Sequence, residues 1–206
     1  MNKLLLGIIA STSIIHAHTL DIVYLETISL NELTPIHKQH NRAVYANEDR
    51  SLYYKIWNPN YHRSSLFIKA LDAGLFKKIA SLIGIIYDKQ NRCRGYITTG
   101  GVLSLSNTEK SGLKMTPLRY VLPTEQQTNK PYITFYKRLV KNTAKSRYAF
   151  IDLSPTNIIE IEDQFYLIDL ESVEPLSNLR KNFENHPEYS FHIKEYVQDV
   201  RALLNK

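Results

Sequence analysis

The residues best suited to chemistry in this chain lie at three neighbouring points of one stretch. Asp152 follows a short apolar run, Asn157 comes five residues later, and Asp169 follows a further apolar run. Residues 158–168 consist of two apolar runs around a Glu-Asp-Gln turn, a pattern typical of a β-hairpin. If the two strands pair, the three polar side chains lie at one edge of the hairpin. Their carboxylate and amide oxygens are hard ligands that suit Mg²⁺.

This stretch resembles the catalytic loop and metal-binding strand of the protein-kinase-like superfamily. The pattern H-R-D-L-x-x-x-N followed by D-F-G corresponds to residues 150–157 and 169–171. The Asp-to-Asn spacing matches, whereas Phe150 replaces the His and Leu-Glu replaces Phe-Gly. The Asp-Leu-Glu ending is more similar to small-molecule and sugar kinases, of the lipopolysaccharide-core or aminoglycoside and choline type, than to regulated protein kinases. An ordinary hairpin with a solvated Asp at each end is the alternative interpretation.

The resemblance implies ATP and Mg²⁺ as cofactors and a role for each polar residue. Asp152 would orient the acceptor hydroxyl as the catalytic base, and Asn157 and Asp169 would hold Mg²⁺. Ser154 and Glu171 would support the loop.

The resemblance also assigns ATP-binding residues upstream. Lys55 lies in a predicted strand, residues 52–57, where the lysine that binds the α and β phosphates belongs; a lysine on the solvent face of that strand is the other interpretation. In the family, a Glu on the next helix holds this lysine. Here residues 64–73 are predicted to be helical and Asp72 is their only acid, so Asp72 either takes that role or is a surface acid at the helix end.

The turn that is glycine-rich in the family contains no glycine here. Residues 22–30 are predicted to form the first strand, and residues 34–41 the following loop. In one interpretation Lys38, with His40 and backbone amides, replaces the usual phosphate cradle. In the others, nucleotide binding is weak or altered, or the segment is a plain loop.

The order of the predicted elements indicates an α+β fold. The resemblance makes this a two-lobed protein-kinase-like fold with a reduced C-terminal lobe. Residues 18–99, mostly β with one helix, would form the N-terminal lobe, and residues 100–206 the hinge and the lobe with the catalytic loop. Residues 101–130 would form a mobile interlobe region that contributes to acceptor recognition. The further predicted elements are strands at 42–45, 79–87 and 93–99 and helices at 132–145 and 191–204.

Residues 1–17 have the form of a secretory signal peptide, with a short positive start and an apolar run. The run is too short for a comfortable membrane span, so no stable span is expected after cleavage, and the protein would be secreted or periplasmic. An uncleaved anchor or a buried N-terminal helix would instead make it membrane-anchored or cytoplasmic. Because ATP is scarce outside the bacterial cytoplasm, export requires entry into a host cell, another phosphate donor, or loss of activity.

The net charge of +6 is spread along the chain and suits an anionic ligand. There is no nucleic-acid-binding module and no Arg-rich or Gly-rich segment, so we expect no nucleic-acid partner. The predicted function is ATP–Mg²⁺-dependent transfer of a phosphoryl group to a hydroxyl of a small molecule or saccharide. The first alternative is a pseudokinase that binds nucleotide or acts as a scaffold without turnover. The second is an exported α+β surface protein unrelated to kinases.

Overall fold

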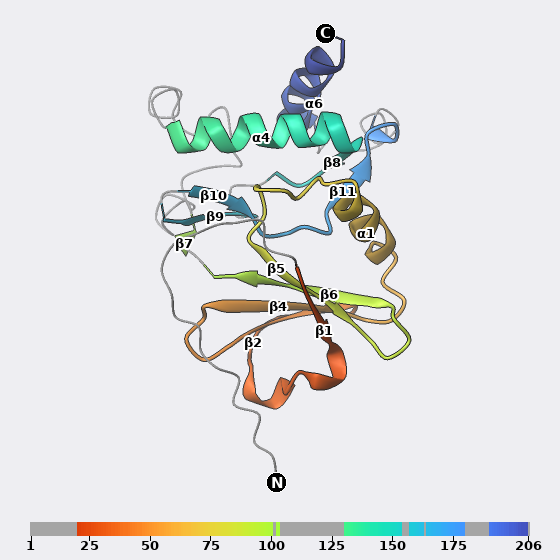
Figure 1. Ribbon diagram of the computed structural model, residues 1–206, viewed down its shortest axis with the longest axis vertical. Helices are drawn as coiled ribbons and strands as arrows, with labels where there is room; N and C mark the ends of the chain where they lie inside the picture. Colours follow the sequence, from red (N-terminus) through yellow and green to blue (C-terminus); the bar gives the residue numbers. More distant parts are fainter. Residues whose placement is uncertain are drawn as a thin grey trace.

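The computed structural model describes residues 20–100, 102–103, 130–153, 157–162, 164–179 and 190–205. In these ranges the chain combines a six-stranded sheet, two smaller sheets and three α-helices (Figure 1). The predicted α+β class is therefore confirmed. The expected signal peptide, residues 1–17, and most of the expected interlobe region lie outside the described residues.

The six-stranded sheet is built from the first half of the chain. Its spatial order is β1-β5-β6-β4-β3-β2, and every neighbouring pair is antiparallel except β1 with β5, which is parallel. Lys55 lies opposite Val44 on one side and Tyr96 on the other, so its strand is an interior one. The strands are β1 (Asp21–Tyr24), β2 (Thr34–Lys38), β3 (Arg42–Ala46), β4 (Leu52–Trp57), β5 (Leu82–Tyr87) and β6 (Cys93–Thr99).

The interior strands have the composition that favours a half-buried sheet. β4 reads Leu-Tyr-Tyr-Lys-Ile-Trp and β5 reads Leu-Ile-Gly-Ile-Ile-Tyr, both rich in aromatic and β-branched residues. The turn between β3 and β4 is closed by Asn47, whose Oδ1 accepts a hydrogen bond of 2.9 Å from the Leu52 N–H. Arg50 in this turn has a positive φ of 55°. The predicted hairpin of β3 and β4 is confirmed.

Helix α1 (Ser64–Asp72) packs between this sheet and the second half of the chain. It ends at Asp72, and Gly74, two residues later, has a φ of 81°, the left-handed conformation that commonly follows a helix end. Phe67 of α1 stacks on Tyr96 with ring centroids 5.1 Å apart and meets Trp57 edge-on at 5.4 Å. These three side chains are at most 1% exposed, so the aromatic core fixes the position of Tyr96.

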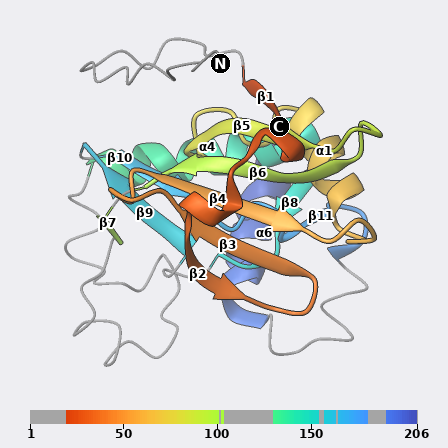
Figure 2. The ribbon, with the colours of Figure 1, turned by 90° about the horizontal axis from the view of Figure 1, so that it is seen from below.

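The second half of the chain forms two small sheets and two helices. Strand order is β10-β9-β7 in one sheet and β11-β8 in the other. In Figure 1 helices α4 and α6 lie on the far side of these strands from the six-stranded sheet, and Figure 2 shows that sheet from below with the helices behind it. The elements are β7 (Val102–Leu103), α4 (Lys130–Ser146), β8 (Tyr148–Phe150), β9 (Ile158–Ile161), β10 (Gln164–Leu167), β11 (Val173–Pro175) and α6 (Ser190–Leu204).

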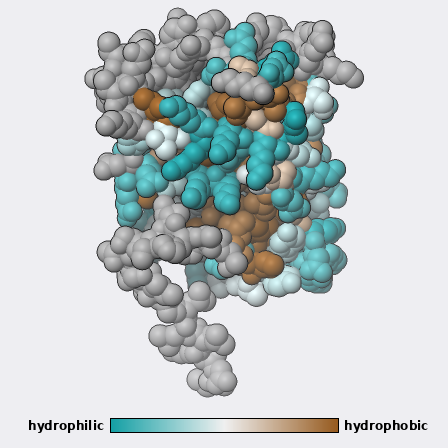
Figure 3. Space-filling model, turned by 45° about the horizontal axis from the view of Figure 1, so that its top comes forward, coloured by the Kyte–Doolittle hydropathy of each residue, from teal (hydrophilic) through white to brown (hydrophobic). Residues whose placement is uncertain are grey.

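Helix α4 has one buried and one hydrophilic face. Phe135 and Leu139 are buried, whereas Lys137, Arg138 and Lys141 are exposed. The top of the molecule, where α4 lies, comes forward in Figure 3, and hydrophilic side chains gather there. Within the described parts of the chain, no helix combines the length and apolar character needed to cross a membrane.

Hydrogen bonds from a backbone N–H and from a side-chain amide tie the two halves together beside the site. The Leu167 N–H at the end of β10 donates to Ile79 O at 2.7 Å. The side-chain amide of Asn142 on α4 donates to Leu75 O at 2.9 Å and to Lys77 O at 2.7 Å. The segment between α1 and β5 is thus fixed to both β10 and α4. This fixes the end of β10 relative to the large sheet.

The structure corrects three expected elements. The strand expected over residues 79–87 begins at Leu82. The strand expected over residues 22–30 ends at Tyr24 and is followed by two 3₁₀ turns, Leu25–Thr27 and Leu30–Glu32. The Thr27 hydroxyl donates to Tyr24 O at 2.7 Å, which closes the first turn. The loop expected over residues 34–41 is mostly strand β2, because its backbone pairs with β3.

Candidate functional site

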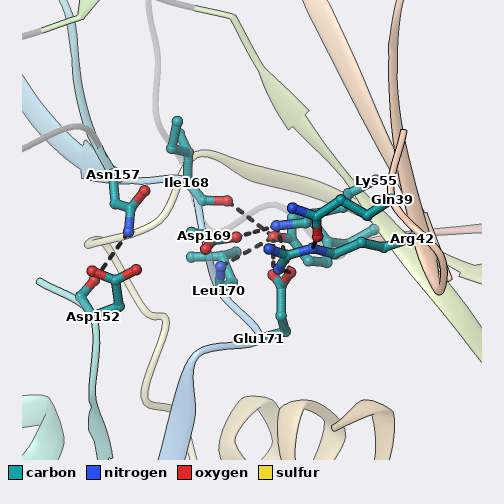
Figure 4. A network of polar contacts seen from close by, with 10 residues as sticks. Gln39, Arg42, Lys55, Asp152, Asn157, Ile168, Asp169, Leu170 and Glu171 are labelled. Atoms are coloured by element: carbon teal, nitrogen blue, oxygen red, sulfur yellow. Dashed lines mark hydrogen bonds and ion pairs between the residues drawn. The ribbon is translucent and has the colours of Figure 1, made fainter. Parts of the chain in front are cut away.

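Lys55 is the centre of a cluster of charged residues between the two halves of the molecule. Its ammonium group forms ion pairs with Asp169 and Glu171, and its side chain is 12% exposed (Figure 4). Burying an ammonium group is costly unless it is paired. The two carboxylates provide that pairing from a segment more than a hundred residues away in the sequence.

Asp169 lies just after β10, in the segment that faces the large sheet. Burial by itself raises the pKa of this carboxyl, but the positive charges of Lys55 and Arg42 and the Lys55 hydrogen bond outweigh burial, so the pKa is lowered. Asp169 is therefore a carboxylate at neutral pH. It was expected from the sequence to hold Mg²⁺, and in this structure its partner is the lysine expected to bind phosphate.

Glu171 is fully buried, and Arg42, Lys55 and Tyr96 all contact its carboxylate. Its Oε1 accepts a hydrogen bond of 2.9 Å from Arg42 Nη1 and also pairs with Lys55. Its Oε2 accepts a hydrogen bond of 2.7 Å from the Tyr96 hydroxyl. A buried carboxylate costs several kcal/mol unless its oxygens are satisfied, and these contacts satisfy both oxygens.

The position of Glu171 goes beyond the loop-supporting role expected from the sequence. Glu171 forms an ion pair with Lys55, the role that was expected of an acid on the helix. Its spacing of two residues from Asp169 is the sequence signal that could have placed it in the same site.

Arg42 is the functional candidate that the sequence analysis missed. It is the first residue of β3, its side chain is 28% exposed, and its Nε donates to Gln39 Oε1 at 2.6 Å. Burial lowers the pKa of its guanidinium, but the negative charges of Glu171 and Asp169 outweigh burial and raise it. The available signal was an arginine directly after a turn without glycine.

Asp152 and Asn157 lie together beside this cluster. The Asn157 side-chain amide donates a hydrogen bond of 3.2 Å to the Asp152 backbone oxygen. The Ile168 N–H donates to Asn157 O at 3.0 Å, so Asn157 is also tied to the residue that precedes Asp169. Figure 4 shows Asp152 and Asn157 to one side of the ion-pair cluster.

The amide orientation of Asn157 is compatible with a metal ligand. Its Nδ2 is used by Asp152 O, and its Oδ1 accepts no hydrogen bond from the described residues. Mg²⁺ keeps several waters and needs only one or two protein oxygens, and Asn157 Oδ1 and the Asp169 carboxylate are the oxygens that would be offered to it. Within the described ranges, no group of three or more His, Cys, Asp or Glu side chains is placed to hold a metal.

The structure does not bring Asp72 to Lys55. Asp72 is exposed at the C-terminal end of α1. The pKa of Tyr87 is raised by burial first, then by the charge of Cys93 and then by that of Asp72. Among the described residues the carboxylates that pair with Lys55 are Asp169 and Glu171. An acid at the helix end, pointing to solvent, was the alternative interpretation of Asp72.

Lys38 and Ser154 are the other two residues expected at the site. Lys38 is exposed at the end of β2, one strand further from Lys55 than β3. Ser154 lies outside the described residues.

A scan of the chain against protein-family models finds no match. No curated protein matches the chain either. A functional assignment therefore depends on the residues and the geometry of the site itself.

Proposed function

We propose that this protein is an ATP–Mg²⁺-dependent phosphotransferase that transfers a phosphoryl group to a hydroxyl of a small molecule or saccharide. The proposal includes a two-lobed protein-kinase-like fold with a reduced C-terminal lobe. The observation that carries it is the ion pair between Lys55, on an interior strand of the large sheet, and Asp169, after β10. Both residues were selected from the sequence for complementary roles in phosphoryl transfer, and they meet across 114 positions of the chain.

Each residue has a distinct role in the proposed reaction. Lys55 binds phosphate oxygens, and Asn157 and Asp169 supply the oxygen ligands for Mg²⁺. The metal, when bound, neutralises negative charge on the phosphates. Asp152 orients the acceptor hydroxyl and accepts its proton, and the Asn157 hydrogen bond to its backbone oxygen holds it in position.

A nucleotide-binding or scaffold module without turnover is the second candidate function. Two observations favour it: the turn between β2 and β3 contains no glycine, and the Asp169 carboxylate is engaged by Lys55. The two functions differ in whether a bound nucleotide is turned over.

A thermal-shift titration with ATP, with and without Mg²⁺, tests both candidates. A ligand that binds only the folded state raises the melting temperature. We expect a rise that requires Mg²⁺ and that Asp169→Asn removes. No rise in the unmodified protein at millimolar ATP would contradict the enzyme and favour a scaffold that binds no nucleotide.

A further inference from the structure

We propose that Arg42 is a second phosphate-binding residue beside Lys55, so that side chains hold a polyphosphate where this chain lacks a glycine cradle. The inference rests on the proposed function, because it concerns the same site. It adds a residue that neither the motif nor the spacing of the sequence assigns. It also names the ligand chemistry, a chain of at least two linked phosphates.

The charged groups of Arg42 and Lys55 lie side by side. Arg42 Nη1 donates to Glu171 Oε1 at 2.9 Å, and the Lys55 ammonium contacts the same oxygen atom. The two side chains come from adjacent strands, β3 and β4, and converge on one point (Figure 4). Two cations that share one carboxylate oxygen are close enough to bind neighbouring phosphates of one ligand.

The charge balance of the cluster favours an anionic ligand once Asp169 is used elsewhere. Arg42 and Lys55 carry two positive charges, and Asp169 and Glu171 carry two negative charges. If Asp169 serves as a metal ligand, as the proposed function requires, two cations are left facing the single carboxylate of Glu171. The excess positive charge is then available for phosphate oxygens.

Arg42 is also accessible and has donors to spare. Its side chain is 28% exposed, whereas that of Glu171 is fully buried, so a ligand from solvent reaches the arginine first. Among the described residues, its Nε donates to Gln39 and one Nη1 donor to Glu171, out of the five N–H donors of a guanidinium. The remaining donors have the planar geometry that binds phosphate oxygens in pairs.

The backbone N–H of Gln39, in the neighbouring turn, is not free to bind phosphate. A glycine-rich loop binds phosphate through backbone N–H groups. Here the Gln39 N–H donates to Arg42 O at 2.8 Å and closes the turn between β2 and β3. Because this N–H is used internally, a side chain that projects from the base of the same turn can take its place.

Isothermal titration calorimetry with two probes tests the inference: ATP with Mg²⁺, and inorganic tripolyphosphate alone. For Arg42→Gln we expect Kd for both probes to rise on the order of tenfold, since a hydrogen bond to a charged group is lost. The salt dependence of tripolyphosphate binding should also become weaker. Arg201→Gln, which removes an exposed arginine from α6, is the matched control and should leave both affinities unchanged.

The outcomes separate this inference from the proposed function. If Lys55→Met abolishes binding and Arg42→Gln binds as the unmodified protein does, the role of Arg42 is overturned and the proposed function stands. If the unmodified protein binds neither probe, both are overturned. Should Arg42→Gln fail to fold, Arg42→Lys decides, because it keeps the charge and loses the paired donors. Weaker binding by Arg42→Lys supports the inference, and unchanged binding overturns it.

Discussion

The Tyr96 hydroxyl donates a hydrogen bond of 2.7 Å to Glu171 Oε2, although the two residues are 75 positions apart in the chain. The same hydroxyl accepts a hydrogen bond of 3.0 Å from the Leu170 N–H. Burial and then the charges of Glu171 and Asp169 raise the pKa of Tyr96 well above its usual value, so the hydroxyl keeps its proton and remains a donor. The aromatic core of the large sheet thereby sets the position of the carboxylate that holds Lys55.

Tyr96→Phe should destabilise the protein by about 1–3 kcal/mol, because Glu171 Oε2 and the Leu170 N–H both lose a partner while the ring packing is kept. Urea denaturation measures the change. Tyr54→Phe is the matched control, since Tyr54 is half-buried in β4 with no side-chain hydrogen bond to the described residues. We expect the control to differ from the unmodified protein by less than about 0.5 kcal/mol. Equal stability of the Tyr96 and Tyr54 variants would show that the Tyr96 hydroxyl does not hold Glu171.

Lys55→Met should remove Mg²⁺–ATP binding and also lower the free energy of unfolding. Breaking a buried ion pair by removing one partner typically costs about 3–5 kcal/mol, because the other charge stays buried. Asp169 and Glu171 would be left with Arg42 as their nearby cation. Thermal shift measures both effects, as the melting temperature without ligand and the rise with ligand. Lys137→Met on the exposed face of α4 should change neither. A Lys55→Met protein that keeps the ligand-dependent rise would exclude Lys55 from the phosphate site.

Asp152→Asn should abolish phosphoryl transfer and spare nucleotide binding, because the variant loses the base and keeps the backbone oxygen that Asn157 contacts. Removal of a general base typically lowers the rate by about 100- to 10,000-fold. The measurement is ADP release with a panel of sugars and small alcohols, alongside the thermal shift. Asp21→Asn, an exposed substitution on β1, is the control.

The unmodified protein itself separates the two candidate functions in this assay. Mg²⁺-dependent binding without ADP release for any acceptor would favour the scaffold over the enzyme. An Asp152→Asn variant that releases ADP at the rate of the unmodified protein would remove Asp152 from the chemistry.

Asp88 should contribute to stability only above acidic pH. It lies in the turn between β5 and β6; burial raises its pKa, but hydrogen bonds from Arg92 and from the Gln90 backbone outweigh burial and lower it from 3.8 to about 2. The folded state thus binds the proton less tightly than the unfolded state. The stabilisation is present above pH 3.8 and is lost as the pH falls toward 2. Urea midpoints measured across this window should fall less steeply for Asp88→Asn, and identical slopes would contradict the assignment.

Much of the secondary structure could be predicted from the sequence, because it depends on neighbouring residues. The hairpins of β3 with β4, β5 with β6, and β9 with β10 follow from alternating apolar runs around polar turns. Helices α1, α4 and α6 follow from apolar residues at helical spacing. The first strand and the loop after it were predicted less well, since β2 is exposed along its whole length and carries no apolar pattern.

The sequence alone also selected four residues of the candidate site, since Lys55, Asp152, Asn157 and Asp169 stand at recognisable spacings within short stretches. Only the tertiary structure decided which charges meet. Arg42 and Glu171 are 129 positions apart, and no local periodicity reports a contact between segments so distant in the chain. Glu171, and not an acid on α1, is the partner of Lys55. It is buried there because the aromatic core of the large sheet packs against the segment after β10.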